Sequence, residues 1–304
     1  MNKFFLISAD SVNSRLDRWL RRNICEIPQS LIEKNLRKGR IKVNNKRKKS
    51  SYKLKKNDKI DVHNFNFSER INKKIKFIYS PTKKELFSNS IFIENNENFV
   101  VINKPAGIAV QSGTKSKKNI IDILRKTQEF KDARPYTVHR IDKETTGILI
   151  VAKNRKYAQL LTSLFRLRKI HKTYLGIALG ELKENKGTLI DILFYYEGRK
   201  KIKTKAITRF SVIDSNNNYS LLKLDPETGR KHQLRKQLLI HGHPILGDPK
   251  YRILEKAINT NNRLMLHAHK IFFSINNIKY NFFADLPLQF KDVLREKYLK
   301  ISSL

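Results

Sequence analysis

The sequence predicts an α+β protein with a small N-terminal domain and a larger domain built on a mixed, mainly antiparallel sheet with flanking helices. The chain has 304 residues, more than one typical domain and fewer than three. After residue 89, many apolar segments have the length and alternation of strands, and few helical segments separate them, which argues against a doubly wound parallel sheet. Residues 1–76 stand apart because they hold 22 Lys and Arg against 7 Asp and Glu.

The charge of the chain indicates a polyanionic partner. Lys and Arg total 64 against 27 Asp and Glu, which gives a formal net charge of +37. A chain this basic is expected to bind nucleic acid. Genome composition can account for part of the lysine excess, so the positions of the bases carry more weight than their total.

Cysteine usage and hydropathy limit the cellular setting. Cys25 is the only cysteine, which excludes an intrachain disulfide and any multi-cysteine metal site and fits a reducing cytosol. The chain shows no signal-peptide core and no apolar run of membrane-spanning length. We therefore expect a cytoplasmic protein without a membrane partner.

The N-terminal region predicts a compact helical module. After a tail at residues 1–13, residues 14–24 place apolar side chains on one helical stripe, with Ser14 as a candidate N-cap. A second helix over residues 28–38 ends at Gly39, and strands are expected at residues 40–44 and 58–62. The stripe consists of Leu16, Trp19, Leu20 and Ile24.

A linker and the first part of the larger domain follow. Residues 63–88 are polar and lysine-rich without a sustained period, which is typical of a linker. Residues 90–94 and 99–103 flank a polar turn and predict a hairpin. Further along, helical spacing appears at residues 120–126, 154–168 and 291–300, and strand patterns at 172–180, 205–212, 219–224 and 263–274.

Residues 138–153, VHRIDKETTGILIVAK, join a polar turn to an apolar run that predicts a strand buried on both faces. Gly147 can adopt the positive φ of a tight bend, so Asp142 would be presented at a fixed place by the strand that follows. A turn Asp beside Arg140 and Lys143 is also compatible with a solvated ion pair or an Asx-turn.

A second dense motif covers residues 224–248. Thr228 and Gly229 can open a helix whose Leu234, Leu238 and His241 share one face, with Gly242 as its stop. Arg235 lies at the edge of that apolar face. An unpaired buried guanidinium is costly, so Arg235 is expected to have an anionic partner.

Residues 14–62 resemble the small αL RNA-binding module first known from a ribosomal small-subunit protein. The helix, the second helix, the segment RKGRIKVN and a late strand are all present, although Asn57-Asp58 replaces the family's frequent Gly-Asp. The resemblance implies RNA contacts from the basic residues of this module: Arg15, Arg18, Arg37, Lys38, Arg40 and Lys42. Two amphipathic helices with solvated basic faces remain the alternative.

The segments HRIDKETTGILIVAK, KTYLGIALG, TGRKHQLR and HPILGD occur in this order behind the αL-like module. Together they resemble the RluA-type pseudouridine synthases, most of all the RluC-like group that modifies large-subunit (23S) ribosomal RNA. The resemblance spans about residues 14–290 and implies a catalytic domain at residues 89–304, with the active cleft between its two motif-bearing halves. Thr146 stands where most members have Ser, a conservative change.

The resemblance also implies roles for single residues. Asp142 corresponds to the catalytic aspartate, Tyr174 to a tyrosine that packs on the target base and takes part in proton transfer, and Arg235 to the arginine that pairs with the aspartate. Arg140 corresponds to the arginine that fills the gap left by the flipped nucleotide. We further expect substrate contacts from three residues of these motifs, His139, Arg230 and His232, and from Lys104, which directly follows the expected strand at residues 99–103.

The chemistry is compatible with these residue types. Converting uridine to pseudouridine breaks the bond from nitrogen to the sugar and rejoins the base through carbon, without redox change or outside reactant, so no cofactor or metal is expected. An ionised carboxylate kept charged by an arginine suits the reaction, and a base buried in a stack must be flipped out. His241 with His243, and His267 with His269, lack further ligands for a metal and are expected to form hydrogen bonds or to face RNA.

We therefore expect a monomeric, cofactor-free uridine isomerase whose partner is large-subunit ribosomal RNA or its precursor. Two alternatives remain open at this stage. The same reaction could act on transfer RNA, or the chain could be a non-catalytic RNA-binding protein of ribosome assembly. The second alternative leaves the joint presence of Asp142, Tyr174 and Arg235 unexplained, since an acid beside phosphates does not favour RNA binding.

Overall fold

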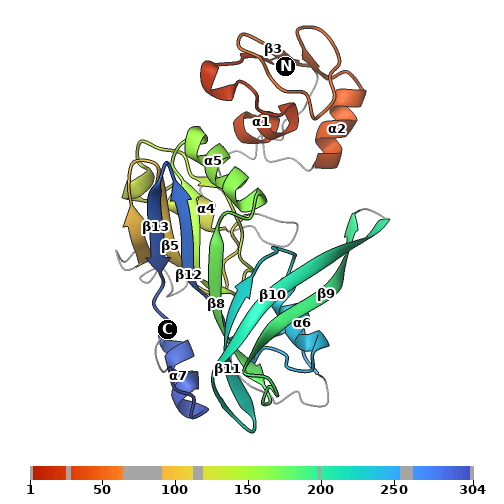
Figure 1. The fold of residues 1–304 in the computed structure, drawn as a ribbon. Helices are drawn as coiled ribbons and strands as arrows, with labels where there is room; N and C mark the ends of the chain where they lie inside the picture. The colour runs from red at the N-terminus through yellow and green to blue at the C-terminus, as the bar shows by residue number, and fades with distance from the viewer. Residues whose placement is uncertain are drawn as a thin grey trace, which may run out of the picture. The chain divides into compact units, whose positions relative to one another are not determined.

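The computed structural model describes residues 3–24, 29–63, 91–111, 119–197, 200–253 and 263–301. The chain divides into two compact units, Met1–Tyr79 and Ser80–Leu304, whose ribbons are drawn in Figure 1. The expected linker lies outside the described residues except for His63, and Cys25 also lies outside them.

The small unit is a three-stranded antiparallel sheet with two helices. Its strands are β1 (Lys3–Leu6), β2 (Ile41–Val43) and β3 (Lys59–Val62), in the order β1-β3-β2. A 3-10 turn, η1 (Ala9–Ser11), precedes the helices α1 (Leu16–Asn23) and α2 (Gln29–Arg37). The expected stripe of α1 is buried, with Leu16, Trp19 and Leu20 at most 6% exposed, and it packs against Ile32 and Leu36 of α2.

Two expectations for the start of the chain were wrong. Residues 1–13 are not a tail, because β1 pairs with β3 and Ile7 is buried in the core of the small unit. Ser14 does not cap α1, because its hydroxyl donates to the carbonyl of Ser11 and Arg15 occupies the N-cap position without a side-chain cap. The small sheet therefore needs residues that precede the helical stripe.

The large unit confirms the expected mixed, mainly antiparallel sheet. Its strands run in the order β4-β5-β7-β12-β8-β11-β10-β9, with β13 paired to β12 and β6 paired to β7. The strand pair β7–β12 is parallel, and the other strand pairs named here are antiparallel. The parallel pairing is short and joins Thr146 with His267 and Gly147 with Ala268.

Two cores lie on the two sides of this parallel junction. The first packs helix α5 (Arg155–Arg166) against β5 (Phe99–Lys104), β7 (Thr146–Ala152) and β12 (Leu266–Ile275). The second packs α6 (Gln233–Ile240) and α7 (Leu288–Glu296) against β8 (His171–Leu179) and β11 (Tyr219–Pro226). The remaining elements are β4 (Phe92–Asn95), α4 (Ile120–Leu124), η3 (Gln128–Phe130), β6 (Tyr136–Thr137), β9 (Lys186–Glu197), β10 (Lys200–Asn216) and β13 (Ile278–Phe283).

The expected start of the second motif's helix also changes. Helix α6 begins at Gln233, five residues after Thr228, because the Thr228 hydroxyl bonds to the Gln233 amide oxygen at 2.7 Å and holds the intervening residues in a turn. Leu234 and Leu238 are buried as expected, whereas His241 is exposed and pairs with Asp191 at 3.3 Å. Gly242 follows the helix with φ +81°.

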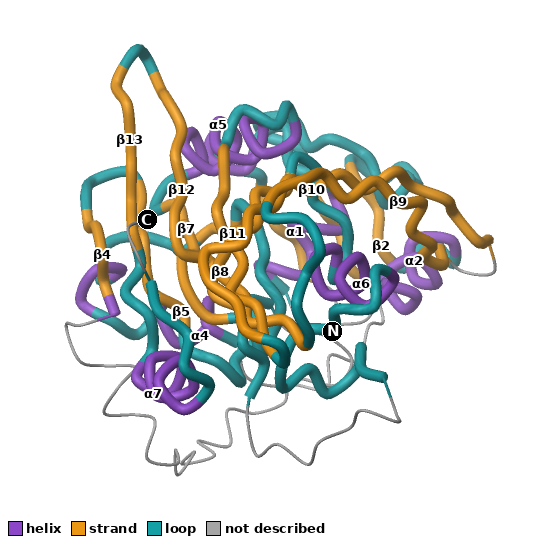
Figure 2. Tube along the Cα trace, turned by 60° about the horizontal axis from the view of Figure 1, so that its bottom comes forward, coloured by secondary structure: helices purple, strands orange, loops and turns teal. Residues whose placement is uncertain are grey.

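Besides β1 and the two-residue β6, sequence reasoning missed two longer strands, β9 and β13. Strand β9 carries apolar residues on both faces, so it lacks the alternation by which a half-exposed strand is found. Strand β13 follows Asn276 and Asn277, which both have positive φ and connect β12 to β13 in a tight hairpin. The pair of asparagines is the signal that identifies this hairpin in the sequence. Figure 2 shows β9 and β10 running side by side at one end of the large sheet.

Gly147 allows β7 and β12 to approach each other. Its φ is +104°, and a Cβ at this position would overlap the carbonyl oxygen of Ala268 and lie 2.7 Å from the Ala268 nitrogen. Gly107 also has a positive φ, +83°, but a Cβ there would meet nothing within 4 Å. A side chain at Gly107 would therefore meet backbone strain alone, whereas a side chain at Gly147 would meet both backbone strain and steric overlap.

We predict that Gly147→Ala lowers the free energy of unfolding by about 3 kcal/mol or more, because backbone strain and overpacking of β12 add. Gly107→Ala is the matched control and should cost only about 1 kcal/mol of strain. Urea denaturation of both variants measures the difference. Equal losses for the two variants would show that the approach of β7 to β12 does not require glycine.

Candidate active site

Asp142 is held in a tight turn just before β7. The backbone nitrogen of Thr145 donates to the Asp142 carbonyl at 3.2 Å, and the turn leads directly into the fully buried strand. The Asp142 side chain is 25% exposed and faces a cavity of about 390 Å³. A cavity of this size lies in the range of small-ligand sites, about 300–1,000 Å³.

Lys104 supports this turn and does not line the cavity, contrary to the expected substrate contact. It is fully buried, and its ammonium donates to the carbonyl oxygens of Pro105, Ile108 and Lys143 at 2.7, 3.1 and 3.1 Å. Burial lowers the pKa of Lys104 to about 7, a change opposed by the negative charges of Glu144 and Asp142. Lys104 thus ties the end of β5 to the residue that follows Asp142.

Arg235 lies between two carboxylates. Its Nη1 donates to Asp142 Oδ2 at 3.0 Å, while Nε and Nη2 donate to the two oxygens of Asp248 at 2.7 Å each. Burial alone would lower the pKa of Arg235, but its hydrogen bonds and ion pairs with Asp248 and Asp142 raise it. The expected anionic partner of Arg235 is therefore a pair of acids, of which one faces the cavity.

Asp248 is the member of this cluster that sequence reasoning did not assign. Its side chain is 0% exposed, and Oδ1 also accepts from the backbone nitrogens of Lys250 and Tyr251 at 2.8 and 2.9 Å. The Tyr251 ring covers the guanidinium of Arg235, with 5.0 Å between the ring centroid and the guanidinium carbon. The Gly-Asp at the end of the motif HPILGD was the available signal.

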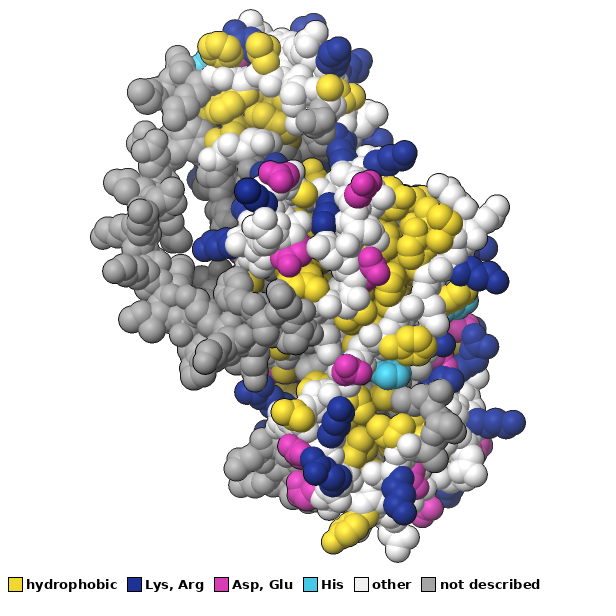
Figure 3. Space-filling model, turned by 90° about the vertical axis from the view of Figure 1, so that its left-hand side faces the viewer, with side chains coloured by type: hydrophobic (Ala, Val, Ile, Leu, Met, Phe, Trp, Pro, Cys, Tyr) yellow, Lys and Arg dark blue, Asp and Glu magenta, His cyan; other side chains and the backbone are white. Residues whose placement is uncertain are grey.

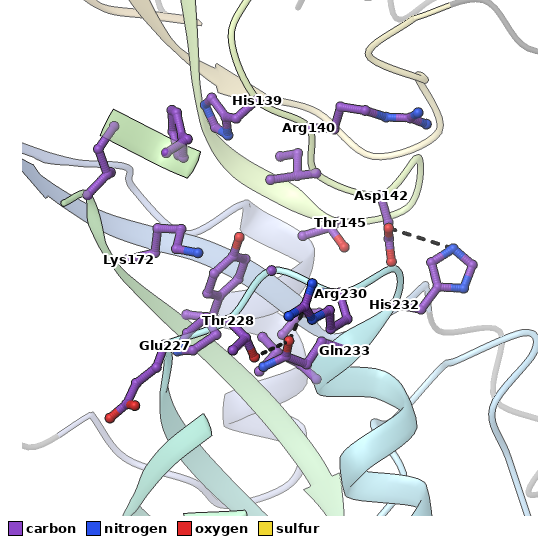
Figure 4. A pocket seen from close by; sticks show the side chains of 18 of the residues that line it. His139, Arg140, Asp142, Thr145, Lys172, Glu227, Thr228, Arg230, His232 and Gln233 are labelled. Atoms are coloured by element: carbon purple, nitrogen blue, oxygen red, sulfur yellow. Dashed lines mark hydrogen bonds and ion pairs between the residues drawn. The ribbon is translucent and has the colours of Figure 1, made fainter. Parts of the chain in front are cut away.

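His232 forms the wall beside Asp142. Its backbone is in the left-handed region with φ +54°, and its Nε2 lies 3.7 Å from Asp142 Oδ1, as Figure 4 shows. Its Nδ1 hydrogen-bonds to the Tyr251 hydroxyl at 2.8 Å. Burial lowers the pKa of His232, whereas the negative charge of Asp142 raises it. The structure thus brings the predicted His232 to the predicted Asp142.

Tyr174 forms another wall of the same cavity. It comes from β8, where its register partner is Leu224 of β11. Burial, followed by the negative charge of Asp142, raises the pKa of the Tyr174 hydroxyl, so the side chain is a neutral phenol in the resting site. A neutral ring fixed in a sheet offers an apolar face for a planar base.

His139 lines the cavity but is held by the protein itself. Its Nε2 accepts from the backbone nitrogen of Ile150 at 2.9 Å, and its ring stacks on Phe165 with 4.3 Å between centroids. Burial, followed by the charge of Lys172, lowers the pKa of His139 to about 3. The residue therefore stays neutral and offers a ring face and Nδ1 rather than a charge.

Lys172 is a lining residue that sequence reasoning did not select. It is two residues before Tyr174 on β8, and Figure 4 shows it across the cavity from Asp142. Burial, followed by the charge of Arg168, lowers the pKa of its ammonium. Its place in the motif KTYLGIALG was the available signal.

Arg140 and Arg230 lie at the cavity as expected, in different ways. Arg140 is exposed and extends from the loop before Asp142 (Figure 4). Arg230 donates from Nε to the carbonyl of Lys205 at 3.2 Å and from its backbone nitrogen to Gln233 Oε1 at 3.0 Å. The cavity is thus lined from both motif-bearing halves of the large unit.

The predicted RNA-binding residues of the small unit all lie on described segments. Arg18, Arg37, Lys38 and Arg40 are exposed, and Lys42 is partly exposed on β2. Arg15 is also exposed but forms a two-pronged ion pair with Asp17 at 2.8 and 3.1 Å. Figure 3 shows Lys and Arg side chains among apolar ones on the surface of the described residues.

The histidine pairs are hydrogen-bonded. His267 bonds to the hydroxyl of Thr146 at 2.8 Å and to the carbonyl of Ala284 at 3.1 Å, and His269 bonds to the same carbonyl at 3.0 Å. His243 bonds to the carbonyl of Leu179 at 3.0 Å. Within the described ranges, no group of three His, Cys, Asp or Glu residues is placed to hold a metal ion, and no helix is long and apolar enough to span a membrane.

Comparisons with solved structures support the fold. The structure titled Human RNA Pseudouridylate Synthase Domain Containing 4 superposes with a TM-score of 0.61 at 26% identity, covering 70% of this chain and 94% of that one. The structure titled Human RNA Pseudouridylate Synthase Domain Containing 1 shares the fold with a TM-score of 0.56 at 22% identity, covering 64% and 83%.

Comparisons of sequence agree with this likeness. The family model of the RNA pseudouridylate synthases matches residues 98–239. Proteins named ribosomal large subunit pseudouridine synthase C are 34% identical in Buchnera aphidicola subsp. Baizongia pistaciae, over 96% of both chains, and 32% identical in Haemophilus influenzae, over 97% of this chain and 94% of the relative. The chain therefore belongs to the RNA pseudouridylate synthase family, and it is an RluA-type RNA pseudouridine synthase.

Proposed function

We propose that this enzyme isomerises specific uridines to pseudouridines in large-subunit ribosomal RNA and that Asp142 acts on the sugar of the target nucleotide. The observation that carries the proposal is the position of Asp142, which faces a nucleotide-sized cavity while Arg235 holds its carboxylate from behind. The names of the relatives, which cover nearly the whole chain, support the class of RNA.

Asp142 supplies the negative charge that the reaction needs. Breaking the bond between N1 of the base and C1′ of the ribose leaves the electron pair on the base and makes C1′ electron-poor. An ionised carboxylate serves either as a nucleophile at C1′ or as a base that removes the proton from C2′. In the first route the carboxylate leaves C1′ when C5 of the turned base bonds to C1′. In the second route the carboxylate returns its proton to C2′ when C5 bonds to C1′. In both routes the proton on C5 is then transferred to N1.

Arg235 acts as a positioning residue for Asp142. Its two bonds to the buried Asp248 fix the plane of the guanidinium and direct Nη1 toward Asp142. Charge-assisted pairs of this kind are short and directional. Removing the arginine would leave Asp248 buried without its cation, which typically costs about 3–5 kcal/mol.

Tyr174 and Arg140 are suited to an extruded nucleotide. The target atoms of a uridine in a helix are hidden in the base stack, so the base must leave the stack to reach Asp142. The Tyr174 ring provides a wall for the base within the cavity, and Arg140 extends from the rim toward solvent, where it can occupy the vacated place. The isomerisation involves no net oxidation or reduction, so these side chains need no redox cofactor for it.

The small unit is proposed to bind RNA as an αL-type domain. Arg37 is the last residue of α2, Lys38 and Arg40 lie in the connection on either side of Gly39, and Lys42 lies in β2. These four basic residues are therefore close in sequence at one helix-to-strand connection. Arg15 is less available because Asp17 occupies its guanidinium. Exposed Lys and Arg side chains of this kind bind RNA phosphates, and the affinity for RNA then falls as the salt concentration rises.

The proposal predicts discrete sites of modification. After incubation of the purified enzyme with unmodified large-subunit ribosomal RNA, carbodiimide labelling and primer extension should show stops at a few uridines that are absent without enzyme. Unmodified transfer RNA, treated in parallel, should show none. Stops in transfer RNA alone would overturn the assignment of substrate, and stops in neither RNA despite tight binding would favour a non-catalytic assembly protein.

Changing Arg37 and Lys38 together to Ala should weaken RNA binding about tenfold at moderate salt and reduce the slope of log affinity against log salt by about 1.5, since about 0.7–0.9 is lost per phosphate contact. The rate at saturating enzyme should change less than twofold. Filter binding across a salt series measures this. The control variant changes the exposed residues Lys279 and Lys291 to Ala. An equal loss of RNA affinity in both variants would contradict a specific role of the small unit in RNA binding.

A further inference from the structure

The β9–β10 hairpin carries an exposed apolar stripe beside a row of lysines. Ile190, Ile192 and Phe194 of β9 are 56%, 52% and 41% exposed. In the antiparallel register, Phe194 lies opposite Lys203 and Ile192 lies opposite Lys205. We call Ile190, Ile192, Phe194, Lys201, Lys203 and Lys205 the hairpin face; the lysines are all exposed.

The hairpin face is not explained by folding. The other face of β9 buries Leu189 and Leu193, and α6 is fixed on that side by Gln237, which donates to the Leu189 carbonyl at 3.1 Å. Strand β9 ends the order of the large sheet, so its far edge is not paired within the described residues. Exposed apolar groups next to an edge strand usually mark a binding surface.

The charges around Phe194 indicate an anionic partner. The Lys201 and Lys203 ammonium groups lie 4.2 and 6.0 Å from the centroid of the Phe194 ring. At the edge of β9, the Lys236 ammonium donates to the Phe194 carbonyl at 3.2 Å. Burial lowers the pKa of Lys236, and the like charges of Lys250 and Lys231 lower it further. Positive charge therefore lies beside the Phe194 ring and also at the backbone carbonyl of Phe194.

The hairpin face adjoins the rim of the catalytic cavity. Arg230 lines the cavity and donates from Nε to the Lys205 carbonyl at 3.2 Å. Glu227 also lines the cavity and pairs with Arg209 of β10 at 3.2 Å. Lys236, which contacts Phe194, directly follows Arg235 on α6. An RNA strand that leaves the cavity past Arg230 therefore comes next to Lys205 of the hairpin face.

We propose that the hairpin face binds the unpaired nucleotides that flank the target uridine, with a base against Phe194 and phosphates near Lys203 and Lys205. The inference rests on the proposed function, since it names where the RNA around the reacting nucleotide lies. Protein surfaces that bind single-stranded RNA usually combine aromatic side chains, on which nucleobases stack, with Lys and Arg side chains that contact the phosphates. A second copy of this chain fits the face poorly, because self-association would place lysines against lysines.

The test compares two aromatic–lysine pairs of the same kind. Phe194→Ala with Lys203→Ala removes the pair on the hairpin face. Phe283→Ala with Lys270→Ala removes a pair on β12 and β13, where the ammonium lies 4.8 Å from the ring centroid and Phe283 is 49% exposed. Thermal unfolding shows whether the Phe194 variant is stable. If it is not, the variant Lys203→Glu with Lys205→Glu provides the test, because it changes only exposed side chains.

Filter binding to large-subunit ribosomal RNA and the single-turnover rate of pseudouridine formation are the readouts. We expect the Phe194 variant to bind about tenfold more weakly, the charge-reversal variant to bind more weakly still, and the control to stay within about twofold of the wild type. Rates at saturating enzyme should remain within about threefold, because no catalytic group is changed.

Wild-type affinity in both hairpin variants would overturn the inference, and so would an equal loss in the control pair. An absence of pseudouridine with the wild-type enzyme would instead contradict the proposed function. In that case the binding comparison would still show whether RNA contacts the hairpin face, so the two failures are distinguishable.

Discussion

The guanidinium of Arg235 between two carboxylates is the interaction on which the site depends. Asp248 takes two of its hydrogen bonds and is fully buried, so the arginine has no freedom to turn, and its remaining edge meets Asp142. The three residues come from the turn before β7, from α6 and from the segment after α6. One ion cluster therefore joins parts of the chain that are far apart in sequence and fixes the Asp142 carboxylate in one orientation.

The site also depends on how the two halves of the large sheet meet. Asp142 comes from the half that contains β7, whereas Tyr174 and Arg235 come from β8 and α6 on the other side of β12. The parallel contact between β7 and β12 is short and requires the missing side chain of Gly147. Lys104 adds stiffness through three backbone carbonyls. The relative position of acid and tyrosine thus follows from packing at this junction.

The sequence predicted what local patterns determine and missed what distant contacts determine. The buried strand β7, the helical stripe of α1 and the positive φ of Gly147 follow from spacing and residue type. Strand β9 was missed because its exposed face is also apolar, so its sequence does not alternate between apolar and polar residues. An exposed apolar face of this kind suits a binding surface. Asp248 and Lys104 could not be placed, because their partners are supplied by the folded chain.

The most direct test of the account is the effect of Asp142→Asn on pseudouridine formation. Asparagine keeps the size and the hydrogen-bonding ability of the side chain but removes its charge, and the single-turnover rate should fall below about one-thousandth of the wild-type value. RNA affinity should stay within about threefold, because the contacts to the RNA backbone are unchanged. An Asp142→Asn enzyme that formed pseudouridine at the wild-type rate would contradict the central role given to this carboxylate.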